Sequence, residues 1–196
     1  MIKNYIKRIF RFVNSTMSKI HWQISGSDVF VGRRSKIVHG KLISFGDHVN
    51  IQPDCLIVAF PGNAKFKIGM GADIGRFSRI ACKNKIIIEE NVFTGPNVFI
   101  CDFNHTYEDI NIPIKAQGET VYSSGVKILK DTWIGTNAVI VGNVTIGKHC
   151  VIGANSFVNH DVPDYCVAVG SPAKVVKKFD FEKNTWVKIN NKNIKD

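Results

Sequence analysis

The sequence has no long hydrophobic run and neither of two common nucleotide-binding motifs. No stretch of about 18 apolar residues occurs, so we expect no transmembrane helix. The basic start, residues 1–13, lacks an apolar core followed by a small-residue cleavage site, so we expect no secretory signal. Neither G-x-G-x-x-G nor the complete G-x-x-x-x-G-K-[ST] is present, which argues against dinucleotide-binding and P-loop domains.

Cysteine is scarce and acidic residues are in the minority. The five cysteines are odd in number and contain no C-x-x-C, which predicts reduced thiols and a cytoplasmic protein. No Cys/His cluster has metal-ligand spacing, so we expect no metal. With 16 acidic and 26 basic residues, the net charge is +10, which attracts anions. No aromatic-rich basic motif of a nucleic-acid module is present, so a phosphate-bearing cofactor and an acidic glycan are the partners we expect.

What the sequence does contain is a repeat of six residues between Val31 and Val162. Of 13 hexads, 11 open with Ile or Val, and all carry a small residue in fifth place. A period of six matches neither a helix nor a simple alternating strand, but it is typical of parallel β-helices. We therefore predict an all-β solenoid of about seven coils, each built from three hexads with an ideal length of about 18 residues. The hexads begin at Val31, Phe45, Ile51, Ile68, Ile74, Ile88, Thr94, Ile128, Ile134, Ile140, Ile146, Ile152 and Val158.

The repeat is interrupted between about 101 and 125. Long loops in compact proteins are often functional. This one contains N104-H-T-Y-E-D-I-N-I-P-I, and His105 stands at its root. An imidazole suits general acid–base chemistry near neutral pH, although a lone loop His is more often an exposed bystander.

The pattern [Ile/Val]-Gly-x-x-[small]-x resembles the hexapeptide-repeat acyltransferases. Four landmarks resemble the maltose, galactoside and surface-polysaccharide O-acetyltransferase branch in their order and spacing. They are the loop segment that begins at Asn104, W133-I-G, G153-A-N-S-F-V and G170-S-P-A-K. The resemblance implies a left-handed prism, whereas the general crossover rule favours a right-handed one. It also implies a homotrimer whose sites lie at subunit interfaces.

The same resemblance implies residue roles. His105 is the general base that takes a proton from a sugar hydroxyl as it attacks acetyl-CoA. Asp102 is the first candidate to orient His105, with Glu108, Glu119 or a backbone oxygen as alternatives. Trp133 either contacts the ligand or only packs against a neighbouring subunit. Asn104 holds the acceptor or serves as a turn residue, and Tyr107 is a further acceptor contact.

For acetyl-CoA, the resemblance implies contacts along late coils. The small or turn residues are Gly135, Asn137, Gly142, Gly153, Ala154 and Ser156. Three lysines, Lys174, Lys177 and Lys178, are expected near the adenylate end, where a solvated charge run is the alternative interpretation. The family more often has Asn where Ser171 stands.

The expected organisation is a basic amphipathic segment at 1–23, a β-helix domain at 24–175 and an extension at 176–196. The first segment either caps the prism or contacts an anionic membrane surface. The predicted activity is O-acetyl transfer to a sugar or surface polysaccharide. Alternatives are an N-acetyltransferase for an amino sugar, a streptogramin- or chloramphenicol-type drug acetyltransferase, and a non-enzymatic or carbonic-anhydrase-like prism.

Overall fold

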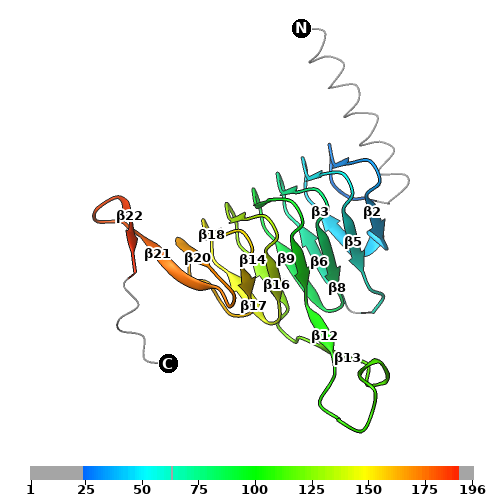
Figure 1. Ribbon diagram of the computed structural model, residues 1–196. Coiled ribbons are helices and arrows are strands. Elements are labelled where there is room, and N and C mark those ends of the chain that lie inside the picture. The colour runs from blue at the N-terminus through cyan, green and yellow to red at the C-terminus, as the bar shows by residue number, and fades with distance from the viewer. Residues whose placement is uncertain (1–23, 63, 190–196) are drawn as a thin grey trace.

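The computed structural model describes residues 24–62 and 64–189. They form a parallel β-helix in which three sheets make the faces of a triangular prism (Figure 1). The chain visits sheets A, B and C in turn, so each complete coil has an AB, a BC and a CA corner. The predicted all-β solenoid is confirmed, while the predicted segment at 1–23 lies outside the described residues.

The strands are short and lie in register between coils. Sheet A contains β1 (Phe30–Val31), β4 (Asn50–Ile51), β7 (Asp73–Ile74), β10 (Phe93–Thr94), β15 (Trp133–Ile134), β18 (Val151–Ile152) and β20 (Cys166–Val169). An antiparallel hairpin extends sheet A and contains β21 (Lys174–Asp180) and β22 (Thr185–Lys188). Sheet B contains β2 (Lys36–Val38), β5 (Leu56–Ala59), β8 (Arg79–Cys82), β11 (Phe99–Cys101), β16 (Val139–Val141) and β19 (Phe157–Val158). Sheet C contains β3 (Ile43–Phe45), β6 (Lys65–Ile68), β9 (Lys85–Ile88), β14 (Val126–Ile128) and β17 (Val144–Ile146). A 3₁₀ turn, η1 (Gly40–Leu42), precedes β3.

The predicted hexad phase is confirmed by burial. The first and fifth residues of every predicted hexad have exposed fractions of 7% or less. Each buried Ile or Val contributes roughly 1.5–3 kcal/mol relative to an exposed side chain. The hexad frame omitted further core positions in sheets B and C, where no glycine follows the aliphatic residue. They include Ile37, Ile57, Ile80, Ile86 and Ile100.

The predicted coil length of 18 residues holds for only one coil. On neighbouring strands of sheet A, Phe30 pairs with Asn50 and Asp73 pairs with Phe93, and the difference in residue number gives coils of 20 residues. The 18-residue spacing occurs between Trp133 and Val151. The early coils are longer because they place additional residues in the turns at the BC corner, between β2 and β3, β5 and β6, and β8 and β9. This corner can therefore change length without disturbing the stacked strands.

The AB corner, by contrast, is nearly invariant in geometry. Asn97, Asn137 and Asn155 stack there with φ of 58–59°. The Asn97 amide donates to Asn137 Oδ1 at 2.9 Å, and the Asn137 amide donates to Asn155 Oδ1 at 3.0 Å. Asn tolerates this left-handed backbone better than most residues, so the ladder supports the tight turn.

The core phase makes a direct stability prediction. Ile140→Asp places a carboxylate in a fully buried position of β16 and should cost several kcal/mol, enough to unfold a marginal domain. Val139→Asp should be mild, because this half-buried neighbour points to the outer face. Urea unfolding followed by circular dichroism measures both, and equal losses would contradict the assigned phase.

Candidate functional site

The interruption forms a projecting arm, residues 102–124, at the BC corner (Figure 1). Its root is a two-stranded antiparallel ribbon of β12 (Phe103–His105) and β13 (Glu119–Val121). A 3₁₀ turn, η2 (Ile114–Ala116), lies near the tip. The Gln117 amide donates to the carbonyls of Asp109 and Ile112, both at 2.7 Å, so the tip has its own hydrogen-bonded frame.

Asp102 anchors this arm to the preceding coil. Its side chain is fully buried, and the backbone N–H groups of residues 83–85 donate to its oxygens at 2.5–2.8 Å. In the described part of the chain, no hydrogen bond joins Asp102 to His105. Asp102, the first candidate to orient His105, is therefore not bonded to it. Its carboxylate instead accepts the backbone N–H groups of the turn between β8 and β9.

Glu119 is the carboxylate that lies across the ribbon from His105. It forms an ion pair with Lys83, which comes from the turn below the arm. The Lys83 ammonium lies 4.9 Å from the ring centroid of Phe60 and 4.8 Å from that of Phe103. This cluster joins three successive turns of the BC corner through charge and cation–π contacts. Glu108 instead accepts a hydrogen bond from the Tyr107 backbone N–H at 2.9 Å.

His105 ends β12 with its side chain exposed. Its backbone N–H donates to Asn104 Oδ1 at 2.9 Å, and Asn104 itself lies within β12, opposite Thr120 of β13. Within the described residues, no hydrogen bond involves the His105 ring. Tyr107 is 62% exposed on the adjoining chain. The imidazole is thus presented outward, accessible to a ligand or a neighbouring molecule.

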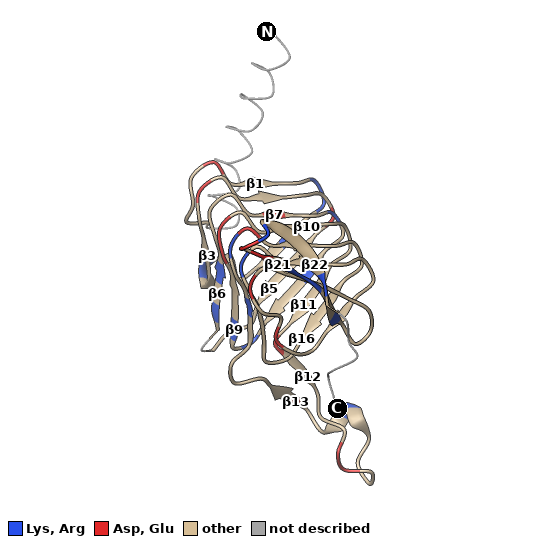
Figure 2. Ribbon diagram, turned by 90° about the vertical axis from the view of Figure 1, so that its left-hand side faces the viewer, with Lys and Arg blue, Asp and Glu red and all other residues tan. Residues whose placement is uncertain are grey.

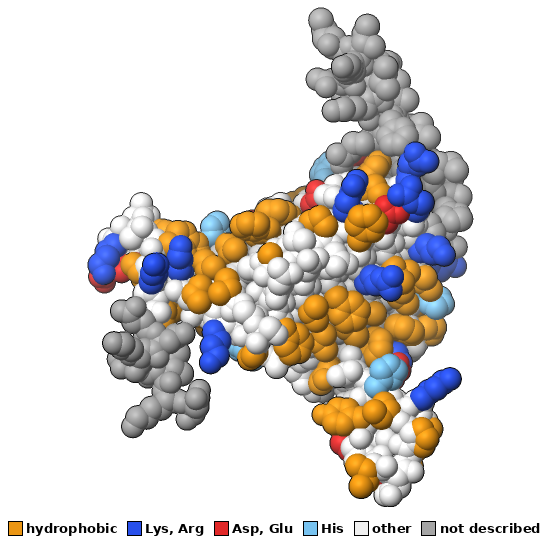
Figure 3. Space-filling view, viewed as in Figure 1, with side chains coloured by type: hydrophobic (Ala, Val, Ile, Leu, Met, Phe, Trp, Pro, Cys, Tyr) orange, Lys and Arg blue, Asp and Glu red, His pale blue; other side chains and the backbone are white. Residues whose placement is uncertain are grey.

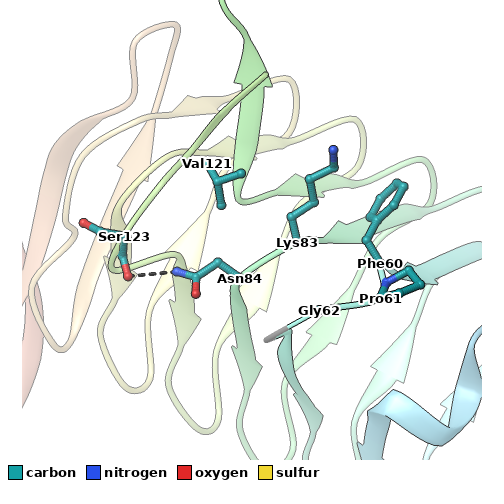
Figure 4. Close-up of a pocket in the computed structure, with 7 residues that line it drawn as sticks. All are labelled: Phe60, Pro61, Gly62, Lys83, Asn84, Val121 and Ser123. Carbon is teal, nitrogen blue, oxygen red and sulfur yellow. Dashed lines mark hydrogen bonds between the residues drawn. The ribbon is translucent and has the colours of Figure 1, made fainter. Parts of the chain in front are cut away.

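A hollow of about 650 Å³ lies at the arm root (Figure 4). Lys83 contributes a cation and Phe60 an aromatic wall, while the Asn84 amide closes one side by donating to the Tyr122 and Ser123 carbonyls at 2.9 Å. The lining combines polar and apolar groups, as a sugar-binding surface does. Its residues are Phe60, Pro61, Gly62, Lys83, Asn84, Val121 and Ser123.

Trp133 lies on the outer face of sheet A, 45% exposed. Its ring stacks on Phe93, with centroids 5.7 Å apart and an interplanar angle of 4°. Sheet A is the face opposite the BC corner, because the corner joins the other two sheets. One chain therefore holds His105 and Trp133 on opposite sides of the prism.

The residues expected to contact a cofactor differ in how far they are exposed. At the AB corner Asn137 and Ala154 are exposed and Gly153 is half-buried, whereas Gly135 and Ser156 are buried. A Cβ on Gly135 would meet the Ala154 nitrogen at 2.6 Å, and Ser156 Oγ accepts from the Gly170 N–H at 3.2 Å. Gly135 and Ser156 thus serve coil stacking, and their surfaces are closed to a ligand.

The remaining expected contacts lie apart from this group. Gly142 is buried at the BC corner with φ of 119°. Lys174, Lys177 and Lys178 are exposed on β21. None of the three forms an ion pair with a described residue. Their side chains are available to an anionic group.

Two structural findings concern metals and membranes. Among residues 24–62 and 64–189, no group of three His, Cys, Asp or Glu side chains is placed to hold a metal ion. Within the same residues, no helix is long and apolar enough to cross a bilayer.

All five cysteines are free and buried, and burial raises the pKa of Cys55, Cys101 and Cys150 to about 11.

Comparison with known proteins identifies the family. The model of the bacterial transferase hexapeptide (six repeats) matches residues 125–160. A putative acetyltransferase of Saccharomyces cerevisiae is 30% identical over 93% of this chain and 89% of its own length. The chain belongs to the hexapeptide-repeat acetyltransferase family.

Two further relatives extend the comparison. A probable acetyltransferase of Mycobacterium tuberculosis is 36% identical over 88% of this chain, and the match spans 57% of that longer protein. A putative lipopolysaccharide biosynthesis O-acetyl transferase of Escherichia coli is 28% identical over 74% of this chain and 76% of its own length.

Solved structures of this hexapeptide-repeat type share the fold. AntD, an N-acyltransferase from Bacillus cereus solved with dTDP and coenzyme A, gives a TM-score of 0.70 at 20% identity, covering 86% of this chain and 90% of AntD. A hexapeptide-repeat acetyltransferase from Vibrio cholerae, solved with acetyl coenzyme A, gives 0.56 at 25% identity, covering 84% and 75%. The prism is left-handed, as the family resemblance implied.

The anchoring role of Asp102 can be tested by stability. Asp102→Asn removes the buried charge that accepts three backbone N–H bonds from a half-buried turn, and we expect a loss of about 2–4 kcal/mol. Asp161→Asn is the matched control, because its exposed carboxylate accepts one such bond, from the Thr145 N–H at 2.6 Å. Thermal unfolding measures the difference, and an Asp102→Asn protein as stable as the control would refute the anchor.

Proposed function

We propose that this protein is an acetyl-CoA-dependent O-acetyltransferase whose acceptor is a hydroxyl of a sugar in a surface polysaccharide or its precursor. The observation that carries this proposal is the exposed imidazole of His105, held on a two-stranded ribbon whose β13 strand contributes Val121 to a mixed polar and apolar hollow. The family membership and the relative named for lipopolysaccharide O-acetylation support the same reaction class.

Bound acetyl-CoA supplies an activated acetyl group. His105 accepts the proton of the acceptor hydroxyl as the hydroxyl oxygen attacks the thioester carbonyl. The carbon–sulfur bond then breaks, and the proton held on the imidazole passes to the departing thiolate. No covalent bond to the protein is needed, because the thioester is already reactive. The imidazole therefore begins and ends the cycle in its neutral form.

Glu119 and Asp102 support His105 in different ways. Glu119 is the cross-strand neighbour of His105 and is held by Lys83, so it is our candidate to orient the ring when substrate binds. Asp102 acts one step further away, by fixing the strand that carries His105. The exposed side chain of Tyr107 remains a candidate acceptor contact.

The exposed subset of the predicted cofactor residues fits acetyl-CoA. Lys174, Lys177 and Lys178 offer unpaired cations for its phosphates, and the open surface at Asn137 and Ala154 suits its narrow pantetheine arm. We therefore propose that these side chains, with half-buried Gly153, hold the cofactor. Gly135, Gly142 and Ser156 would shape the backbone behind it.

We propose a homotrimer in which the arm of one subunit meets sheet A and the AB corner of the next. His105 and Trp133 lie on opposite sides of one prism, so only a second copy can place them in one site. Hydrophobic side chains also gather along the arm (Figure 3), and Ile110 is 94% exposed there. A neighbouring subunit would cover this surface.

The assembly is testable in solution. Light scattering coupled to size exclusion should give the mass of three chains of 21.9 kDa across a wide concentration range. A fully active monomer would contradict the shared site.

We also propose that the protein is cytoplasmic, because the reduced thiols and the acetyl-CoA substrate suit that compartment.

Acetylation of an amino sugar is the competing activity in the same family. An acceptor panel that includes neutral sugars, amino sugars and chloramphenicol distinguishes these reactions by thiol release.

His105→Ala should lower turnover by about 10²–10⁴, the usual contribution of a positioned general base. His160→Ala is the matched control, since this ring is exposed and its one hydrogen bond within the described residues is to Asn159, at 2.9 Å. A His105→Ala rate within about threefold of wild type would remove His105 from the mechanism.

The lysine pair on β21 should affect binding instead of chemistry. Lys177→Ala combined with Lys178→Ala should raise the apparent KM for acetyl-CoA by about tenfold, with little change in saturated turnover. Lys183→Ala is the control on the same hairpin, because it pairs with Asp180 at 3.2 Å. Initial rates at varied acetyl-CoA measure both effects, and an unchanged KM in the double variant would exclude these cations from the site.

A further inference from the structure

The outer face of sheet C carries a ladder of lysines. Lys65 on β6 lies beside Lys85 on β9, and Lys67 and Lys127 flank Ile87 on consecutive strands. Because strands lie ~4.8 Å apart, Lys67 and Lys127 are about 10 Å from each other along the prism. Basic residues colour this side of the molecule blue along β6 and β9 in Figure 2.

These charges have no partners in the described part of the protein. None of Lys65, Lys67, Lys85 and Lys127 forms an ion pair there, and the other outward side chains of sheet C are Ser44, Ile87 and Thr145. No strand of sheet C contains an acidic residue, and Glu89 and Glu90 lie at the corner that follows β9. Like charges on neighbouring strands repel, so an anionic partner would relieve this repulsion.

The face is hollowed as well as basic. A depression of about 480 Å³ lies over β3 and β6, with Lys41, Lys65 and Lys67 around it and Leu42 and Ile87 contributing apolar surface. A flat bilayer surface does not reach the floor of a depression, whereas a single extended chain does. No aromatic side chain points outward from sheet C, so the face offers no stacking platform for nucleic-acid bases.

The ladder is continuous with the arm. Lys85 directly follows Lys83 and Asn84, which line the hollow at the arm root. A chain lying across sheet C therefore leads towards the ribbon that carries His105.

We propose that sheet C binds an acidic polysaccharide, so that carboxylates of the polymer contact the lysine ladder while one sugar reaches the arm. This inference rests on the proposed function and narrows its acceptor to a repeating polyanion. The polymer is recognised by spaced negative charge, and the reacting hydroxyl is selected separately at the arm.

The test compares binding of fluorescent polygalacturonate to the full-length protein and to two triple variants. The first triple variant combines Lys65→Gln, Lys67→Gln and Lys127→Gln. It should raise the Kd for polygalacturonate by about tenfold or more, and this Kd should depend less steeply on salt concentration. Arg33→Gln, Lys36→Gln and Lys188→Gln remove the same charge from other surfaces and should change the Kd by less than about twofold. Neutral dextran should not bind to any of the three proteins.

Three outcomes would overturn the proposal. Equal losses in both triple variants would mean attraction by net charge alone. Tighter binding of phosphatidylserine vesicles or duplex DNA than of polygalacturonate, lost in the sheet C variant, would assign the face to a membrane or a nucleic acid. No binding of the polyanion by the wild-type protein would also reject it.

Failure of the proposed function is recognised separately. Transfer to a monosaccharide acceptor should be the same in the wild-type protein and the sheet C variant, since the variant leaves the arm intact. A protein that never releases thiol but binds polygalacturonate through the ladder would refute the O-acetyltransferase and retain the binding face.

Discussion

The rest of the structure depends on the stacking of one coil on the next in strict register. Ile51, Ile74, Thr94, Ile134 and Ile152 occupy one column of sheet A, and each strand fills its hydrogen bonds with the strands above and below. This arrangement places small residues, such as Ser78 and Ala72, at the AB and CA corners. The prism therefore has a continuous core and offers only its faces, its corners and its insertions for function.

That constraint explains where the chemistry is placed. The BC corner tolerates added residues and carries the arm, and Asp102 ties that arm to the turn of the preceding coil. The AB corner has a fixed asparagine ladder and offers a regular surface for an extended cofactor. His105 and Trp133 consequently lie on different sides of one prism, which is why we propose a site shared between subunits.

The sequence was sufficient for the core positions that follow the six-residue period and for the location of the arm. Core residues such as Ile37, Ile57 and Ile80 were missed, because they fall outside that period. Trp133 is the sixth residue of the hexad that begins at Ile128, and in the structure this position faces outward. The sequence could not show the partners of Asp102, because stacking joins residues about 18 positions apart and the corner lengths vary. The same reason hid the burial of Gly135 and Ser156, whose small size serves the neighbouring coil. The sheet C lysines are dispersed between Lys65 and Lys127, and only the strand register aligns them.

The central claim is that each active site combines the arm of one subunit with sheet A of another. Mixed trimers of His105→Ala and Trp133→Ala chains test it most directly. At equal ratio, random assembly gives about a quarter of interfaces with both side chains intact, so thiol release should recover to about a quarter of the wild-type rate. Activity no greater than the sum of the two variants measured separately would show that His105 and Trp133 do not share a site across subunits.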